Sequence, residues 1–242
     1  PLLPHPRFRG KSKAGWYGDF VIQTDDAVGQ ILKSLEKNGL AENTLVIFTS
    51  DNGSYMRSQL AEPDHRADKS SQNFHPNTHR ANGIYRGTKA DIWESGHRVP
   101  FFAKWPGKIE AGSKSAATIT HTDLMATCAD IVKKDLPEKS GEDSFRWLPL
   151  FDGRNDDFKR APVINHSANG TFAIREGKWK LVLGDGSGGR EAPRGKPFKK
   201  PYTLFDLEVD PSEQSNVIDK YPEVAKKLEA ECLRLREAGR SR

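Results

Sequence analysis

The sequence predicts an α/β protein to which a small antiparallel sheet and a C-terminal helix are appended. Apolar residues recur at helical spacing between residues 16 and 38, and a short β-branched run follows at once. After about Gly153, the pattern changes to that of a β-hairpin followed by a last helical stripe. We therefore expect two parts, residues 1–155 with the α/β pattern and residues 156–242 with the smaller α+β pattern.

The first part begins with an extended, ordered loop at residues 1–15, where prolines and glycines gather. A helix over residues 16–38 should end at Gly39, which is a typical C-cap residue. The continuous apolar run at residues 44–49 indicates a buried strand of a parallel sheet. Helix, short connection and buried strand together make half of an α/β unit.

A long polar segment at residues 54–85 follows, without apolar periodicity. A loop of this length in a compact domain is usually functional or disordered. Beyond it we expect a strand at residues 99–103 and a helix capped by Thr122.

The second part should contain a hairpin at residues 172–183 with a two-residue turn at Glu176–Gly177. Residues 184–201 are rich in Gly, Pro and Lys and predict a mobile surface loop. The remaining expectations are a strand at 202–207 and a final helix from Pro222 to Gly239, with an apolar stripe of Val224, Leu228, Cys232 and Leu235.

Composition limits the functional classes. The 38 basic and 33 acidic residues give a net charge of +5, which fits anionic partners. The charges are mostly dispersed, as on a solvated face, and only residues 190–200 and 234–242 are clustered. The first cluster contains a single Phe, so we expect no nucleic acid partner. No apolar run approaches the length of a membrane span, and none is expected.

The two cysteines, Cys128 and Cys232, form neither a zinc pattern nor a disulfide framework. Each falls on the apolar stripe of an expected helix. We therefore predict that both are buried, unpaired thiols.

Two positions carry candidate chemistry. Asp51, Asn52 and Gly53 follow the strand at residues 44–49, and ligands bind beyond the carboxyl ends of strands in open α/β sheets. Carboxylate and amide oxygens suit a hard cation such as Ca²⁺, although Asp-Asn-Gly is also a common turn. Lys89 is either an exposed loop lysine or a point charge that binds an anionic ester.

Taken in order, several segments resemble the C-terminal half of the type I, arylsulfatase-like sulfatases of the alkaline-phosphatase superfamily. The resemblance covers nearly the whole chain and rests on residues 15–19, 25–29, 43–53, 85–94, 96–101, 105–107, 121–127, 142–144, 173–181 and 204–207, with Asn216. It implies an alkaline-phosphatase-like mixed sheet with flanking helices, of which residues 1–155 supply the C-terminal portion, plus the small sheet and helix.

The resemblance also implies roles for individual residues. Asp51 and Asn52 match the pair that completes the family's Ca²⁺ site, and Lys89 matches its sulfate-contacting, catalytic lysine. His79 resembles a histidine that some bacterial members place in the substrate cleft. The implied reaction is hydrolysis of a sulfate ester, with sulfated carbohydrate among the candidate substrates. The implied location is periplasmic or extracellular, and we expect no signal peptide within residues 1–242.

Other family features are absent from these 242 residues. The family nucleophile, formylglycine, comes from a C/S-x-P/A-x-R motif, and Cys232–Arg236 departs from it because Arg234 stands at the Pro/Ala position. The chain also begins at Pro1 without Met. We expect a fragment whose partner is the N-terminal half of the same protein, with formylglycine and further Ca²⁺ ligands there, and we expect this fragment alone to be inactive.

Three alternatives remain at this stage. A metal-dependent phosphatase of the same superfold would need several His and Asp ligands at wider spacing. A basic module could bind sulfated polysaccharide without turnover. A non-catalytic sulfatase homologue would keep the fold and lose the chemistry.

Overall fold

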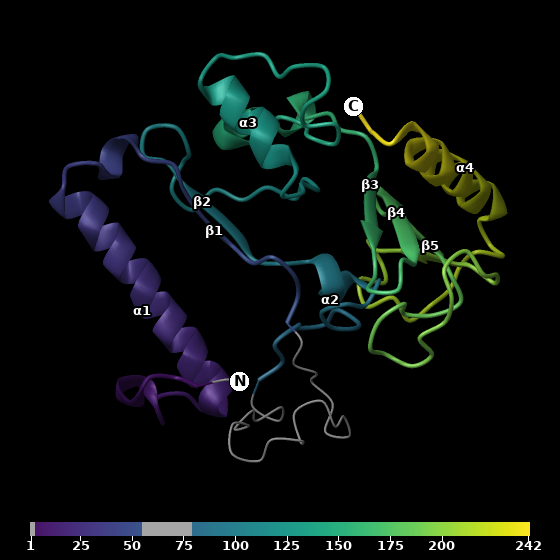
Figure 1. The fold of residues 1–242 in the computed structure, drawn as a ribbon, viewed down its shortest axis with the longest axis horizontal. Helices are drawn as coiled ribbons and strands as arrows, with labels where there is room; N and C mark the ends of the chain where they lie inside the picture. The colour runs from purple at the N-terminus through teal and green to yellow at the C-terminus, as the bar shows by residue number, and fades with distance from the viewer. Residues whose placement is uncertain (1–2, 55–78) are drawn as a thin grey trace.

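The computed structural model describes residues 3–54 and 79–242, which form a helical arm, a strand pair and a four-stranded sheet with a helix on it (Figure 1). The N-terminal loop contains the short helix η1 (Pro6–Phe8), which was not expected in an extended loop, and leads into α1 (Gly15–Lys37), which matches the helix predicted at residues 16–38. Buried Asp19 holds the loop against the start of α1, because its carboxylate accepts the amides of Gly10 at 2.8 Å and Ser12 at 2.7 Å.

The strand predicted at residues 44–49 is β1 (Val46–Thr49), and the strand predicted at 99–103 is β2 (Phe101–Lys104). The expectation of a buried parallel strand is wrong for the described residues, since β1 pairs antiparallel with β2 and Phe48 and Phe102 remain exposed. A short apolar run identifies a strand but contains no information on the direction of its neighbour.

The helix expected after Thr122 is α3 (Asp123–Ile131), and its orientation contradicts the prediction for Cys128, which is exposed. The buried face of α3 consists instead of Asp123 and Thr127, one turn apart. Thr127 accepts the amide of Trp147 at 3.0 Å, and Asp123 pairs with Arg160 at 2.9 Å. Hydrogen bonding rather than apolar burial therefore decides which side of α3 faces inward.

The C-terminal part is an antiparallel sheet in sequence order. Its strands are β3 (Val163–His166), β4 (Phe172–Glu176), β5 (Trp179–Leu183) and β6 (Thr203–Asp206). Because Glu176 pairs with Trp179, the hairpin turn is Gly177–Lys178, one residue later than predicted. Strand β3 was not among the predicted elements. The other short elements are η2 (Ala41–Asn43), α2 (Glu94–His97), η4 (Leu148–Asp152) and η5 (Asn155–Asp157).

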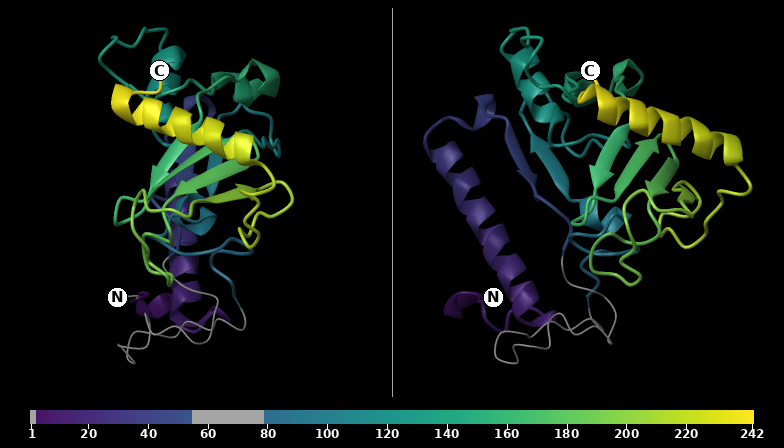
Figure 2. Two further views of the ribbon diagram at one scale, coloured as in Figure 1. Left: turned by 90° about the vertical axis from the view of Figure 1, so that its right-hand side faces the viewer. Right: turned by 45° about the vertical axis from the view of Figure 1, so that its right-hand side comes forward.

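Both faces of this sheet are covered. Helix α4 (Pro222–Ala238) lies across one face, ends at a left-handed Gly239 and buries Leu228 and Cys232, as predicted (Figure 2). Ile92 and Trp93 pack on the opposite face. The alternation of a strand sends neighbouring side chains of β4 and β5 to the two sides, and the side chains on the α4 side include Ile174, Leu181 and Leu183.

Residues 184–201 are bound to the rest of the fold, so the prediction of a mobile surface loop is wrong. Ser187 is buried, and its carbonyl accepts the amide of Ile92 at 2.8 Å. Glu191 forms an ion pair with Arg86 at 2.6 Å. The glycines in this segment allow it to pack closely against the rest of the fold. A Cβ on Gly189, for example, would lie 2.3 Å from the carbonyl oxygen of Ala90.

No helix within residues 3–54 and 79–242 combines the length and apolar character needed to cross a membrane.

Candidate functional site

A cleft of about 660 Å³ lies where the chain leaves β1. Its walls come from the start of α1, the loop after β1, the segment before α2 and the segment after it. The lining residues are Tyr17, Ser50, Asp51, Asn52, Gly53, Ser54, Ala81, Asn82, Gly83, Tyr85, Lys89, Arg98, Val99 and Pro100.

The loop after β1 is held close to α2. The amide of Gly53 donates to the carbonyl of Gly96 at 3.1 Å, and a Cβ on Gly53 would lie 1.5 Å from the carbonyl oxygen of Ser95. Only glycine permits this approach. Asp51 and Asn52 thereby lie at the cleft wall, with Asp51 exposed and Asn52 half-buried.

Asn82 and Lys89 bind the main chain of Ser54. The Asn82 side chain accepts the amide of Ser54 at 3.1 Å and donates to its carbonyl at 3.0 Å. The amide of Lys89 donates to the same carbonyl at 3.1 Å. The two walls of the cleft are therefore joined through main-chain contacts beside Asp51 and Asn52.

The structure brings three of the four predicted site residues together, since Asp51, Asn52 and Lys89 line one cleft. His79, which is exposed, does not belong to the lining set. Its ring centroid lies 5.6 Å from that of Tyr17, which does line the cleft. The roles of all four residues stay predictions.

The donor atoms at the loop after β1 suit a hard cation in kind. Asp51 supplies a carboxylate and Asn52 a carboxamide oxygen, the ligand types that Ca²⁺ takes. Within residues 3–54 and 79–242, no group of three or more His, Cys, Asp or Glu side chains is arranged to hold a metal ion.

Sequence reasoning missed Tyr17, Asn82, Tyr85 and Arg98 in the cleft wall. The Arg98 guanidinium lies 4.5 Å from the ring centroid of Tyr85, and its Nη1 is 3.1 Å from Glu94. Opposite charges four residues apart were a visible signal for the second contact. Asn82 lies in a polar segment without periodicity, so no comparable signal marked it.

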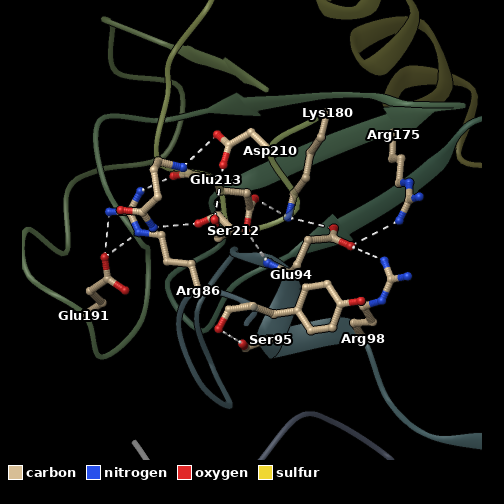
Figure 3. Close-up of polar contacts among 12 residues, drawn as sticks. Arg86, Glu94, Ser95, Arg98, Arg175, Lys180, Glu191, Asp210, Ser212 and Glu213 are labelled. Atoms are coloured by element: carbon tan, nitrogen blue, oxygen red, sulfur yellow. Dashed lines mark hydrogen bonds and ion pairs between the residues drawn. The ribbon is translucent and has the colours of Figure 1, made fainter. Parts of the chain in front are cut away.

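Behind the cleft, a buried charge network joins α2 to the C-terminal sheet (Figure 3). Lys180 lies 3.2 Å from Glu94 and 2.8 Å from Glu213, and Arg175 lies 3.1 Å from Glu94. Burial raises the pKa of Glu94, but Lys180, Arg175 and Arg98 outweigh this effect and leave the pKa below its ordinary value. For Glu213, burial prevails over Lys180 and raises the pKa.

Comparison with known proteins identifies the family to which a chain with this fold and cleft belongs. Residues 6–133 match the family model for sulfatases, and residues 88–238 match the model for the C-terminal region of N-sulphoglucosamine sulphohydrolase. The chain belongs to the sulfatase family, as the sequence motifs predicted.

Individual relatives agree with this membership. An N-acetylgalactosamine-6-O-sulfatase of Bacteroides thetaiotaomicron is 35% identical over an aligned length of 239 positions, and the match covers 94% of this chain and 43% of the relative. The steryl-sulfatase of Homo sapiens is 38% identical over 154 residues, covering 64% of this chain and 24% of that protein. The chain therefore spans less than half the length of these curated relatives.

Solved structures confirm the expected fold. A structure from work on the metabolism of multiple glycosaminoglycans by Bacteroides thetaiotaomicron superimposes with a TM-score of 0.81 at 33% identity, covering 100% of this chain and 48% of that one. The PsFucS1 sulfatase from Pseudoalteromonas sp. gives a TM-score of 0.72 at 24% identity over 96% of this chain and 46% of that one. The second match supports the fold alone.

Proposed function

We propose that this chain forms part of a complete sulfatase that hydrolyses sulfuric esters. The observation that carries the proposal is the shared cleft of Asp51, Asn52 and Lys89 in a member of the sulfatase family. The side-chain oxygens of Asp51 and Asn52 are suitable ligands for Ca²⁺, and the ammonium of Lys89 is a second positive charge beside them. Two positive charges at one place are what is needed to bind a sulfate ester and to neutralise its oxygens.

In this proposal each residue has a defined task. The Lys89 ammonium binds a sulfuryl oxygen and neutralises the negative charge that this oxygen carries, while the S–O bond breaks and its electron pair leaves with the alcohol oxygen. Asp51 and Asn52 hold Ca²⁺, which supplies further positive charge to the same oxygens when it is bound. His79, beside Tyr17, contacts the alcohol portion of the substrate. Formylglycine, the family nucleophile, is contributed from outside these 242 residues.

The proposed partner is the N-terminal half of the same protein. Large apolar side chains lie exposed on α1, β1, β2 and α3 and at the residue that follows α3, namely Phe20, Val21, Ile31, Phe48, Phe102, Leu124, Met125 and Val132. Exposed apolar surface of this extent marks an interface. This chain matches 43% of the length of a related sulfatase, and the remaining part of such a protein is large enough to cover these apolar side chains.

The proposed substrate is a sulfated amino sugar. Support comes from the N-acetylgalactosamine-6-O-sulfatase, which is 35% identical over 94% of this chain. Polymeric, sulfated carbohydrates occur outside the cytoplasm. We therefore propose that the protein acts in the periplasm or outside the cell.

Kinetics of the complete protein, matured by a formylglycine-generating enzyme, test the proposal. With a chromogenic aryl sulfate and with N-acetylgalactosamine 6-sulfate, Lys89→Ala should lower kcat/KM roughly 100-fold or more, the usual cost of removing a group that stabilises charge in the transition state. Lys37→Ala changes another exposed lysine, at the end of α1, and should leave kcat/KM unchanged. Equal values of kcat/KM in Lys89→Ala and Lys37→Ala would show that Lys89 takes no part in the reaction.

A further inference from the structure

The segment that carries Lys89 is a turn that exposes this lysine between buried residues. Thr88 is 1% exposed and Asp91 is 0% exposed, whereas the Lys89 side chain reaches the cleft. Ala90 adopts a left-handed φ of 83°, which residues with a side chain rarely occupy. Such a conformation persists only where the surroundings enforce it.

The Asp91 carboxylate supplies that enforcement. Its Oδ2 accepts the amide of Thr88 at 2.8 Å, which closes the turn around Lys89. Its Oδ1 accepts the amides of Arg190 at 2.5 Å and Glu191 at 3.0 Å, in the segment between β5 and β6. One buried side chain therefore both shapes the Lys89 turn and fixes it to the C-terminal part.

Main-chain contacts reinforce the same attachment. The amide of Ala168 donates to the carbonyl of Ala90 at 3.0 Å, and the amide of Ile92 donates to the carbonyl of Ser187 at 2.8 Å. Gly189 lies so close behind the turn that a Cβ there would meet the Asp91 carboxylate at 2.5 Å. The C-terminal part thus forms the back wall of the Lys89 turn.

We infer that Asp91 is the positioning residue for Lys89: its carboxylate sets the reach of the ammonium into the cleft by holding the turn to residues 190 and 191. The inference rests on the proposed function. A carboxylate only accepts hydrogen bonds, so it satisfies all three amides at once. Asn would direct an NH₂ group at one of these amide donors and leave it without an acceptor.

A double-substitution cycle in the complete protein tests this role. Asp91→Asn should lower kcat/KM for the aryl sulfate about 10-fold, and should weaken competitive inhibition by inorganic sulfate to a similar degree. In a Lys89→Ala background, Asp91→Asn should cause no further loss, because its effect passes through the absent lysine.

Asp123→Asn is the matched control. Asp123 is also 0% exposed and accepts backbone amides, those of Thr120 at 2.8 Å and Phe145 at 3.0 Å, but it lies in α3 outside the cleft lining. Any loss that it causes should be the same in the unmodified and the Lys89→Ala backgrounds, and sulfate inhibition should not change. Should Asp91→Asn not fold, Thr88→Val is the second variant. It removes the hydroxyl contacts to Asp91 at 3.3 Å and to the carbonyl of Lys89 at 3.4 Å, both within the Lys89 turn, and should show the same coupling to Lys89 at smaller amplitude.

The outcomes are distinguishable. Equal losses from Asp91→Asn in both backgrounds, in a protein that turns over sulfate esters, would overturn the positioning role and leave the proposed function intact. No turnover by the unmodified protein would overturn both.

Discussion

Nζ of Lys180 lies 2.8 Å from Oε1 of Glu213, and both side chains are almost completely removed from solvent. The same ammonium reaches Glu94 on α2 at 3.2 Å. Since Glu94 also pairs with Arg98 in the cleft wall, one buried cation is linked both to the C-terminal sheet and to the cleft.

Replacing Lys180 should therefore be costly. Lys180→Met leaves two buried carboxylates without their shared cation, and we expect a loss of about 3–5 kcal/mol from the opening free energy of β4 and β5. Amide hydrogen exchange of these strands in the complete protein measures it. The control, Lys227→Met, removes an exposed pair with Glu176 and should have little effect. Equal effects would show that the network does not stabilise the sheet.

His97 should make the fold sensitive to acid. Burial and the nearby Lys180 lower its pKa to about 4 from the ordinary 6.5, against the opposing effect of Glu94. The unfolded chain therefore binds a proton between these pH values that the native state does not. Stability contributed by neutral His97 is complete above pH 6.5 and is lost as the pH falls toward 4, by up to about 1.4 kcal/mol per unit.

His97→Gln tests this dependence, because glutamine is polar and does not titrate. Unfolding midpoints measured from pH 4 to pH 6.5 should vary less in this variant than in the unmodified protein. His5→Gln, at an exposed position, should retain the original slope. An unchanged slope in His97→Gln would assign the acid sensitivity to other groups.

Much of the fold could be predicted from sequence, and the exceptions have physical causes. The stripe of α4 and the hairpin of β4 and β5 follow from local periodicity, which is sufficient where one apolar face packs on one partner. The orientation of α3 could not be predicted, because Asp123 and Thr127 turn inward to bind main-chain amides contributed by residues 145 and 147.

The candidate site shows the same division. Asp51, Asn52 and Lys89 could be named as candidates because they lie in segments that resemble family motifs, and the fold places them in one cleft. The role of Asp91 could not be predicted, because its partners, residues 190 and 191, are about 100 positions away in sequence. They lie in a segment whose composition predicted a mobile surface loop. Only tertiary packing shows why a buried carboxylate is needed there.

The two cysteines should differ in reactivity. Burial raises the pKa of the Cys232 thiol to about 11, which leaves little thiolate at neutral pH, while Cys128 is exposed on α3. A maleimide or disulfide reagent applied to this 242-residue chain should modify Cys128 first, as peptide mass spectrometry can show. Cys128→Ser should abolish the fast phase. A fast phase that survives this substitution would place Cys232 at the surface.

Calcium binding should depend on Asp51. We expect Asp51→Asn to weaken Ca²⁺ affinity of the complete protein by about 100-fold, because a charged ligand is replaced by a neutral one at the cation. Isothermal titration calorimetry with Ca²⁺ alone reads this out independently of turnover. Asp156→Asn, an exposed position in η5, should leave the affinity unchanged. Unchanged Ca²⁺ affinity in Asp51→Asn would show that Asp51 is not a ligand and that the cation binds at another site.

The most direct test is sulfate release by the complete protein and by this chain, assayed side by side after expression with a formylglycine-generating enzyme. We expect Ca²⁺-dependent hydrolysis of N-acetylgalactosamine 6-sulfate or an aryl sulfate by the complete protein. We expect none from the 242-residue chain, because groups that act as a unit fail together when one is missing. Metal-dependent turnover by the isolated chain at the rate of the complete protein, or no turnover by either, would contradict the account.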